Sequence, residues 1–554
     1  MATGKSASAK LSLLQKEYNA IPYYGRNMSH TLLEETQGIY VMDGRQKEYY
    51  VKANSEYVIE MLSAEADNGQ GAVIPTFADF HDRNPSLSGT PVPFTPVDDL
   101  TDPKLFSGKA KFKIYSPTGL FPAREFTIQL ISGIMQPEAN TYMVKKGSKQ
   151  GILIPVSRVN TAYDYYKTLL DHDATLTGNE KQLLPGDKEE FMLNRLDDDD
   201  DWTVNIVWTD INKSGVTPIQ RAGLEVLKEL GGTGPNSYIY LQAGDMAGNV
   251  LIELRSGKLE RRQTLWSWHI WIVDEYPTVK TLNRTGGEGA AQVKLMSHLL
   301  GAYEEPKSSY SGDAYREFGM QYQWGRKDPF PSYDVYQKVK FYDGDGKLFD
   351  FIKNQKGDRG NYGEQNALQA AGGTLTMKAS IENPNTIASH QSFWQYELFP
   401  CGSVSYFKAR WVFLYPWNKP VDNGSNPEAV GGKTVFDPSP YGFRIMSQDE
   451  SVTLRYAYFH GSKNKDGLIT PLPGSIYDGS FMNGNSGSKS CIFAVSQART
   501  SAHAGRYLLN STFTSAGWTS ASNTSDAYRR AMTYSIRPVI DPEVTDDYTR
   551  YLPK

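Results

Sequence analysis

Cysteine, long apolar runs and an excess of charge of either sign are all scarce in this chain. Its 554 residues include only two cysteines, Cys401 and Cys491, and the formal net charge is -4. Two cysteines exclude a disulfide-dense scaffold, but they leave open whether one bridge forms in an oxidising compartment. No window of about 18 apolar residues occurs, which excludes a transmembrane helix. The basic residues do not cluster as they do in nucleic-acid binders, so nucleic acid is not an expected partner.

Targeting and catalytic motifs are lacking as well. The first ten residues, MATGKSASAK, contain no apolar stretch typical of a signal peptide, so we expect either an intracellular protein or an exported one whose signal is absent from this sequence. There is no HExxH, CxxC, GxSxG or GxGxxG pattern, and the eight histidines include no pair at ligand spacing. Chance explains an isolated SxxK match at Ser486 to Lys489. The sequence therefore predicts a protein that is not an enzyme.

What the chain has in quantity is residues that favour strands and turns. Aromatics make up 12%, with 35 tyrosines, and there are 49 glycines and 30 prolines. This composition favours short strands joined by many turns over long helices. The length predicts about three or four domains. We expect a mainly β multidomain protein.

The stretch Leu265 to Pro277, LWSWHIWIVDEYP, concentrates tryptophan and aliphatic residues. In an extended strand its residues alternate between two sides, and both sides are fit for burial, which predicts an interior strand. His269 could serve as a metal ligand or a base, but a lone histidine between tryptophans is more often a hydrogen-bonded core residue. All ten tryptophans lie from Trp202 onward, which indicates a different kind of module there.

The first 135 residues divide into an arm and a sandwich. Residues 1–37 form the arm, in which Ser6 to Tyr18 is either a short amphipathic helix or extended. In residues 38–135, the segments KAKFKIYS (from Lys109) and REFTIQLIS (from Arg124) alternate apolar with polar residues. Such strands have one buried and one wet face, as in an antiparallel sandwich. The order of strands and loops resembles the immunoglobulin-like modules of Bacteroides surface proteins.

Residues 136–277 predict a second β-sandwich module. Strand-like segments such as WTVNIVWTD and SYIYLQAGDMAGNVLIELRSG are separated by glycine-rich turns. One segment differs, because TPIQRAGLEVLKEL, Thr217 to Leu230, predicts a helix. Thr217 would cap it and Pro218 would occupy its first position.

Four motifs follow one another in the C-terminal half of the chain. They are KLMSHLLGA (Lys294 to Ala302), YQWGRKDPFP (Tyr322 to Pro331), GKTVFDPSPYGFRI (Gly432 to Ile445) and SIRPV (Ser535 to Val539). With ANTYMV, AGNVLIEL and the tryptophan stretch before them, they resemble Bacteroidales cell-surface and fimbria-associated proteins that carry a Fibrobacter succinogenes major paralogous domain. The resemblance spans about residues 140–540 and implies a C-type-lectin-like α+β fold for residues 278–554.

The chain departs from this family at polar positions. Ser297, His298 and Leu299 stand where the family usually has Asp-Arg-Asn, and Ser439 replaces a usual cysteine. The usual Tyr-Trp-Ser-Ser strand reads IFAVSQ at Ile492 to Gln497. The motifs are kept while polar residues within them differ from the family pattern. This is expected of a scaffold with a variable surface, not of a fixed catalytic site.

Calcium is the one metal that the sequence suggests. Asp343 and Asp345 in DGDG could supply oxygens to a calcium loop, and IENPN offers further ones from Glu382, Asn383 and Asn385. DGDG is equally a tight hairpin turn between VKFY and KLFDF. The acidic run Asp197 to Asp201 is most simply a solvated loop, although a cation site there is an alternative.

Aromatic residues in turn-rich sequence are the candidate ligand contacts. We expect Trp411, Tyr415, Trp417, Trp518 and Tyr528 to offer rings on which sugars or protein loops stack. Residues 483–528 are rich in Ser, Asn, Thr, Gly and Tyr, the side chains that recognition loops use. An ordinary polar loop is the alternative interpretation.

Together these features predict a non-enzymatic adhesin or fimbrial tip subunit. It would be exported, lipid-anchored at the outer membrane and exposed on the cell surface, with two immunoglobulin-like sandwich modules carrying a C-type-lectin-like domain. Its ligand would be a glycan or a host or bacterial surface protein, and other fimbrial subunits could be further partners. One alternative is a structural pilus subunit that assembles by β-strand addition. The other is an enzyme on a lectin-like scaffold.

Overall fold

The computed structural model is mainly β. It describes residues 11–16, 31–32, 38–41, 48–53, 56–66, 77–84, 90–93, 107–119, 123–131, 133–148, 150–173, 192–230, 234–257, 263–283, 290–305, 314–323, 325–349, 377–386, 418–420, 430–447, 450, 453, 475–477, 480–482, 489–500, 503–514, 517–519 and 533–553. Strands far exceed helices among them, which confirms the expected mainly β class. The immunoglobulin-like and C-type-lectin-like assignments stay predictions.

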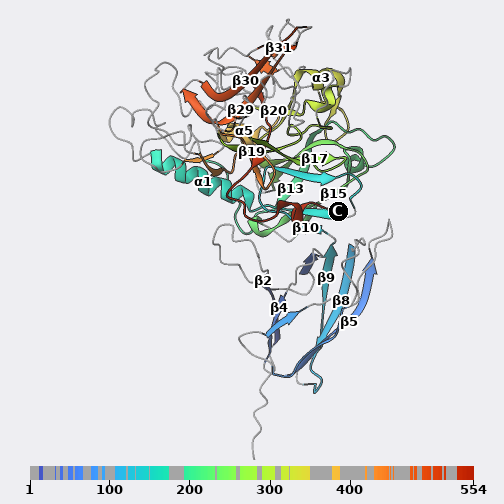
Figure 1. Ribbon diagram of the computed structural model, residues 1–554. Coiled ribbons are helices and arrows are strands. Elements are labelled where there is room, and N and C mark those ends of the chain that lie inside the picture. The colour runs from blue at the N-terminus through green and yellow to red at the C-terminus, as the bar shows by residue number, and fades with distance from the viewer. Residues whose placement is uncertain are drawn as a thin grey trace, which may run out of the picture.

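Two sheets make up the N-terminal part of the chain (Figure 1). Their strand orders are β3-β9-β8-β5-β6 and β2-β1-β4-β7. The strands are β1 (Leu11–Lys16), β2 (Thr31–Leu32), β3 (Gly38–Val41), β4 (Glu48–Ala53), β5 (Tyr57–Ala66), β6 (Phe80–Asp82), β7 (Thr90–Pro93), β8 (Ser107–Tyr115) and β9 (Arg124–Ile131). Within the stretch expected to be either helical or extended, residues 11–16 are extended, because β1 pairs antiparallel with β4 along its whole length.

The alternation predicted for β8 is confirmed. Phe112 and Ile114 are buried, whereas Lys109 and Lys111 are exposed. Phe112 stacks on Phe126 of the neighbouring strand β9, with the ring centroids 5.4 Å apart. One side of this sheet therefore faces an apolar core and the other faces solvent.

Two further sheets lie at the centre of the molecule. Their orders are β11-β17-β16-β13-β22-β23 and β10-β12-β15-β14. The strands are β10 (Gly133–Met135), β11 (Thr141–Lys145), β12 (Gly151–Pro155), β13 (Trp202–Thr209), β14 (Leu224–Leu230), β15 (Tyr238–Ala243), β16 (Gly248–Ser256), β17 (Thr264–Val273), β22 (Phe341–Tyr342) and β23 (Leu348–Phe349). Strand β17 carries the tryptophans and lies between β11 and β16, and all of its residues are buried. The predicted interior strand is confirmed.

The remaining sheets belong to the C-terminal part of the chain. The larger two have the orders β18-β19-β33-β26 and β21-β20-β32-β29-β30-β31. The pairs β24-β25 and β27-β28 each form a separate two-stranded sheet. The strands are β18 (Val279–Asn283), β19 (Gln292–Met296), β20 (Met320–Gln323), β21 (Phe330–Pro331), β24 (Asn418–Pro420), β25 (Val430–Lys433), β26 (Phe443–Arg444), β27 (Ser475–Tyr477), β28 (Ser480–Met482), β29 (Lys489–Thr500), β30 (His503–Thr514), β31 (Gly517–Thr519), β32 (Thr533–Ser535) and β33 (Val539–Ile540).

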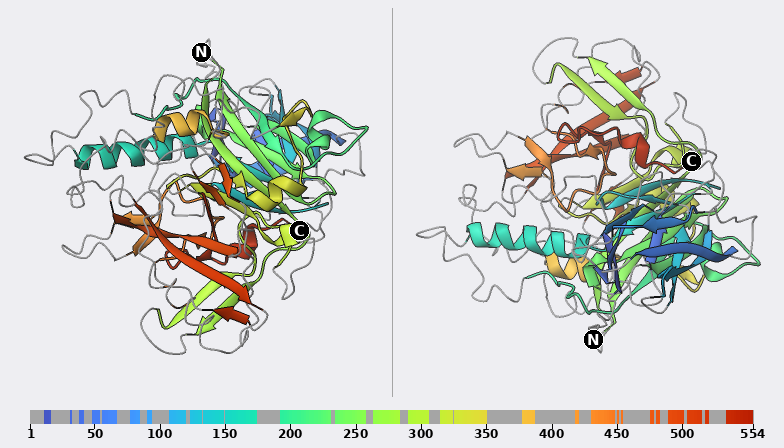
Figure 2. Two further views of the ribbon diagram at one scale, coloured as in Figure 1. Left: turned by 90° about the horizontal axis from the view of Figure 1, so that it is seen from above. Right: turned by 90° about the horizontal axis from the view of Figure 1, so that it is seen from below.

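Helices are few and mostly short in the part of the chain that is described. They are α1 (Arg158–Asp173), α2 (Pro218–Arg221), α3 (Tyr333–Lys338) and α5 (Met377–Glu382), with 3-10 turns η3 (Gly234–Asn236), η4 (Ala314–Glu317) and η6 (Tyr548–Tyr551). Helices α1 and α5 both contact β17, and α5 lies beside α1 in both views of Figure 2. None of these described helices is long and apolar enough to cross a membrane.

The helix predicted from Thr217 to Leu230 is wrong over most of its length. Its start is as expected, because the Thr217 hydroxyl accepts a hydrogen bond from the Gln220 backbone N–H and the helix begins at Pro218. The helix then ends at Arg221, and Gly223 adopts a φ of +82°. The remainder forms β14, which pairs with β15. Pairing with a neighbouring strand outweighs local helix propensity here.

The core is continuous across residue 277, where the sequence led us to expect a boundary between two modules. One cluster of buried apolar residues runs from Ala139 to Ile536. The short hairpin β22-β23, from the C-terminal half, also extends the central sheet by pairing with β13. The cause is β17: because both of its sides are buried, it needs a layer on each side, and the chain after residue 277 provides one of these layers.

The molecule is elongated (Figure 1). The N-terminal sheets form one end, and the body built from residues 133–553 forms the rest, with β29, β30 and β31 toward the opposite end. The large core cluster contains no described residue before Ala139. The two ends of the molecule are therefore built from opposite ends of the sequence.

Candidate functional site

Most of the aromatic candidates fall outside the described residues. Trp411, Tyr415, Trp417 and Tyr528 are in this group. Trp518 is on β31, and its backbone pairs with that of Phe513 on β30. These residues stay candidates for ligand binding, and only Trp518 can be placed in a sheet.

Asp343 and Asp345 form a hairpin turn between β22 and β23. The Asp343 Oδ1 atom accepts hydrogen bonds from the backbone N–H groups of Asp345 and Lys347, at 3.0 and 2.8 Å. Arg221 donates to the Asp345 carbonyl at 2.9 Å, and the Lys347 ammonium lies 3.5 Å from the Asp345 carboxylate. The carboxylate of Asp343 is bonded within the turn, and Asp345 interacts with the cationic groups of Arg221 and Lys347. The calcium interpretation stays a prediction, and within the described ranges no three His, Cys, Asp or Glu side chains are placed to hold a metal ion.

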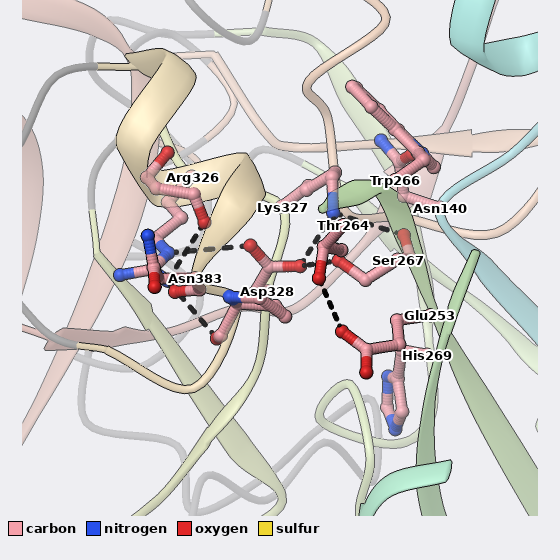
Figure 3. A network of polar contacts seen from close by, with 12 residues as sticks. Asn140, Glu253, Thr264, Trp266, Ser267, His269, Arg326, Lys327, Asp328 and Asn383 are labelled. Carbon is pink, nitrogen blue, oxygen red and sulfur yellow. Dashed lines mark hydrogen bonds and ion pairs between the residues drawn. The ribbon is translucent and has the colours of Figure 1, made fainter. Parts of the chain in front are cut away.

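The strongest chemical cluster is a buried polar network on β17 that the sequence did not single out (Figure 3). Lys327 and Asp328 approach Ser267 from the loop after β20. The Lys327 Nζ atom donates to Asp328 Oδ1 at 2.6 Å, to the Ser267 carbonyl at 3.0 Å and to the Ser267 hydroxyl. That hydroxyl in turn donates to Asp328 Oδ1 at 2.6 Å. All three residues are at most 3% exposed.

Arg326 continues the network toward α5. Its guanidinium lies 3.4 Å from Asp328 Oδ2 and donates to backbone carbonyls of the segment that follows the helix, among them Asn383 at 2.9 Å and Pro384 at 3.1 Å. These carbonyls lack partners within the helix, so the arginine caps its C-terminal end. Arg326 thereby attaches α5 to the network around β17.

The contact between Ser267 and Lys327 has the composition of a nucleophile and its base. Burial lowers the pKa of Lys327 to about 8, which would favour proton transfer near neutral pH. A substrate, however, cannot reach a hydroxyl that is 1% exposed. Asp328 is also bonded to both partners, as a structural ion pair would be. In the described conformation the cluster is a cross-link between β17 and the chain near residue 327.

His269 occupies the same side of β17, two residues further along. Its Nε2 atom lies 2.9 Å from Asn249 Oδ1, and Nδ1 lies 3.1 Å from the Tyr322 hydroxyl. Asn249 donates to Asp210 Oδ2 at 2.8 Å, so its oxygen faces the histidine. This assigns the proton to Nε2 and leaves Nδ1 as acceptor. Burial lowers the pKa of His269 to about 3, so the ring is neutral. The core interpretation fits this geometry.

The Asp210 end of this chain of hydrogen bonds is closer to the surface. The Tyr303 hydroxyl donates to Asp210 Oδ2 at 2.5 Å. Burial raises the pKa of Asp210 to about 6, and the bonds from Tyr303 and Asn249 oppose that shift. A relay of hydrogen bonds thus runs from Tyr322 through His269 and Asn249 to the carboxyl group of Asp210.

The motifs that carry the family resemblance contact one another through these buried bonds. Asn140 of ANTYMV donates to the backbone carbonyls of Val435 and Asp437 in the GKTVFDPSPYGFRI motif, at 2.7 and 2.8 Å. Arg537 of SIRPV donates to the Met296 carbonyl in KLMSHLLGA at 3.0 Å. Lys327 of GRKDPF binds the tryptophan strand, as above. The polar residues of these motifs therefore hold distant segments together. The signal available in the sequence was the charged triplet Arg326, Lys327 and Asp328 between aromatic residues of one motif.

Comparison with known proteins adds no family. No family model matches the chain, and no curated protein matches it either. Among solved structures, cadherin-like domains 1 to 4 of zebrafish RET are 8% identical, with 48% of this chain and 65% of that chain covered and a TM-score of 0.12. A Bacteroides ovatus protein, SGBP-B of a mixed-linkage glucan utilization locus, solved with a mixed-linkage heptasaccharide, is 9% identical over 50% of this chain and 55% of that one, at a TM-score of 0.11.

Extracellular cadherin domains 1–5 of protocadherin gamma B2 are 11% identical, with 60% of this chain and 52% of that chain covered, at a TM-score of 0.11. The chain covers less than two thirds of each of these three structures. Likeness this slight supports no statement about fold or function.

Proposed function

We propose that this protein is a non-enzymatic cell-surface adhesin or fimbrial tip subunit. It binds a glycan or a protein ligand through its C-terminal part. In this proposal the protein is exported and associated with the outer membrane, its N-terminal sheets are immunoglobulin-like modules, and its C-terminal part has a C-type-lectin-like fold. Trp518, together with Trp411, Tyr415, Trp417 and Tyr528, supplies ligand contacts.

The observation that carries the proposal is the division of the molecule into two ends. The N-terminal sheets lie at one end and the ribbon β29-β30-β31, with Trp518, lies toward the other (Figure 1). An adhesin needs this arrangement, because a spacer must hold the binding part away from its anchor.

The second supporting observation is the use of polar residues within the body. The most reactive-looking group, Ser267 with Lys327 and Asp328, is buried and serves as a cross-link. A scaffold that uses its buried charges for cohesion, and leaves recognition to loops on its surface, matches a binding protein better than an enzyme.

Binding of the full chain to a glycan and mucin array, with and without calcium, tests the proposal. We expect binding that Trp518→Ala reduces at least tenfold. Leu62→Ala is the matched control, because Leu62 is a 42% exposed apolar residue of β5 at the opposite end of the molecule. Calcium dependence that Asp343→Ala abolishes would support a calcium site at the β22-β23 turn. A folded chain that binds nothing on the array would contradict the proposal.

The structural-subunit alternative can be tested on the same protein. Strand β1 is used within the protein's own sheet, where it pairs with β2 and β4. Polymerisation by an N-terminal arm would require this pairing to be exchanged for one with a neighbouring subunit. Concentration-dependent polymers that disappear when residues 1–40 are deleted would favour this alternative.

A further inference from the structure

We infer that residues 541–553, the last described segment of the chain, are a latch that controls how stiffly the N-terminal sheets are joined to the body. While the latch is closed, strand β10 stays in its sheet and the connection between the two parts is one residue long. When the latch is released, β10 can leave its sheet and the connection lengthens. This device goes beyond the proposed adhesin function, because it does not depend on what the protein binds.

The connection between the two parts is short. Strand β9, in the N-terminal sheets, ends at Ile131, and β10, the first strand of the body, begins at Gly133. Strand β3 pairs with β9 as far as Ile131 and also contacts β10. One residue between two paired strands has only two freely rotating backbone torsions, so the closed connection is stiff.

Strand β10 has little support within its sheet. It has three residues, and among the described strands it pairs with one neighbour, β12. Short strands at the edge of a sheet open at lower free energy than central strands. Glu138 ends the stretch that can be released, because its carboxylate accepts a hydrogen bond from the Ser157 hydroxyl at 2.7 Å. Residues 132–137 would then form the connection, which at about 3.4 Å per residue spans roughly 20 Å.

The C-terminal half of the body holds the latch through aromatic rings. Tyr548 packs edge-on against Phe443, with the ring centroids 4.8 Å apart. Tyr551 packs edge-on against Tyr441, with the centroids 5.2 Å apart. The described residues after β33 include the 3-10 turn η6 and no strand, so side chains and single hydrogen bonds hold the latch. Contacts of this kind can be released without opening a sheet.

Two glycines make room for the latch. Gly442 has a φ of +83°, and a Cβ atom there would lie 2.6 Å from the Cβ atom of Tyr548. A Cβ atom on Gly432 would collide with the Glu543 carboxylate, which accepts a hydrogen bond from the Gly432 backbone N–H at 2.7 Å. The surface under the latch is therefore shaped to receive this segment.

The far end of the latch reaches the first strands of the body. The Tyr551 carbonyl accepts a hydrogen bond from the side-chain amide of Gln136, the residue after β10. The Pro553 carbonyl accepts one from the Tyr276 hydroxyl at 2.6 Å, and that oxygen accepts from the backbone N–H of Lys145, the last residue of β11. Figure 1 shows the C-terminal end of the chain beside β10, on the side of the body next to the N-terminal sheets. Release of β10 therefore requires the bond between Gln136 and the latch to break.

Amide hydrogen exchange of the full chain tests the latch. Tyr548→Ala combined with Tyr551→Ala removes both rings. We expect at least tenfold faster exchange of the Gln136 amide, which is bonded to the Leu153 carbonyl at 2.9 Å. Gln136→Met keeps both rings but removes the bond to the latch, and it should speed exchange along β10 in the same way. Amides of the central strand β16 should keep their wild-type rate. Thr545→Ala is the matched control, because Thr545 is an exposed residue of the latch.

A distance measurement tests the joint. Spin labels are attached through Leu62→Cys on β5 and Met246→Cys on the body, where the native side chains are 42% and 39% exposed. Cys401→Ser and Cys491→Ser confine the labels to these two positions. The distance distribution should be narrow in this parent chain and at least twice as wide when both latch tyrosines are replaced.

Each result bears on one step of the device. Wild-type exchange along β10 in the variants would overturn the latch, and so would equal acceleration in β16, because the whole body would then be destabilised. A broad distribution in the parent chain would show that the closed connection is not stiff. A narrow distribution in both chains would show that β10 does not leave its sheet. Array binding is a separate readout, so failure of the adhesin proposal and failure of the latch are distinguishable.

Discussion

One lysine–carboxylate pair involves β8 and another lies beside β17, and the two regions use these pairs in opposite ways. On β8 the ammonium of Lys113 lies 3.6 Å from Glu60, and both side chains are about one third exposed. Beside β17 the ammonium of Lys327 lies 2.6 Å from Asp328, and both side chains are 2% exposed. Water competes for the first pair and is excluded from the second. The same residue types form a solvent-exposed ion pair in one region and a buried ion pair that links core segments in the other.

The largest effect should come from cutting the chain at the place where sequence suggested a boundary. A fragment of residues 278–554 lacks β11, β13, β16 and β17, so it loses one layer of the shared core. We expect it to show no cooperative thermal unfolding. A fragment of residues 133–554 keeps that core and should unfold cooperatively, as measured by circular dichroism in the near ultraviolet. Cooperative unfolding of the 278–554 fragment would confirm residue 277 as a domain boundary.

Asp328→Ala tests the buried pair directly. The substitution leaves Lys327 and Arg326 buried without their anion, and breaking a pair of this kind costs about 3–5 kcal/mol. Urea unfolding of the full chain measures the loss. Glu125→Ala is the control, since Glu125 pairs with Lys111 on the exposed side of the N-terminal sheet. Similar losses in the two variants would mean that burial does not distinguish the two regions.

The sequence predicted the two strands well and the bonds between segments poorly. Alternation in KAKFKIYS and the concentration of tryptophan and aliphatic residues around Trp268 are local patterns, and each dictates a burial pattern by itself. The partner of Asp328 cannot be found this way, because Ser267 is 61 residues earlier in the chain. The helix expected over LEVLKEL failed for the same reason, since the deciding contact was with β15. The aromatic candidates from Trp411 to Trp417 lie outside the described residues, and they stay predictions.

Acid should destabilise the body through His269. Its pKa is about 3 when folded and 6.5 in the reference state, so the unfolded chain takes up the proton first. This stability is complete above pH 6.5 and is lost progressively as the pH falls toward 3. Between pH 7 and 5 the loss is about 2 kcal/mol.

His298, with a pKa lowered to about 4, adds to the effect. Asp210 opposes it, because its folded pKa is raised to about 6 and the folded state gains its proton as the pH falls below that value. Comparison with His269→Gln isolates the first contribution. Wild type should lose about 2 kcal/mol more than this variant between pH 7 and 5 in urea unfolding. Equal losses would show that His269 does not titrate on unfolding.

A smaller effect is expected at the start of α2. Thr217→Ala removes the hydroxyl that accepts from Gln220, and such caps contribute about 1 kcal/mol. Thr217→Ser retains the cap and should be nearly neutral. Because only one helical turn follows, the loss should appear as local fraying, which amide hydrogen exchange of residues 219–222 would detect. Unchanged exchange in Thr217→Ala would mean that packing alone holds this turn.

The smallest effect should be that of Lys113→Ala on β8. The ammonium interacts with Glu60 and lies 4.8 Å from the centroid of the Tyr115 ring, but water reaches both charged groups. Exposed pairs contribute about 0.2–1 kcal/mol, and salt should reduce even that. Urea unfolding at low and high salt measures both quantities. If Lys113→Ala lowered the free energy of unfolding as much as Asp328→Ala does, the charged side of β8 would be covered by a partner. Its lysine–carboxylate pair would then be shielded from water, as the pair beside β17 is.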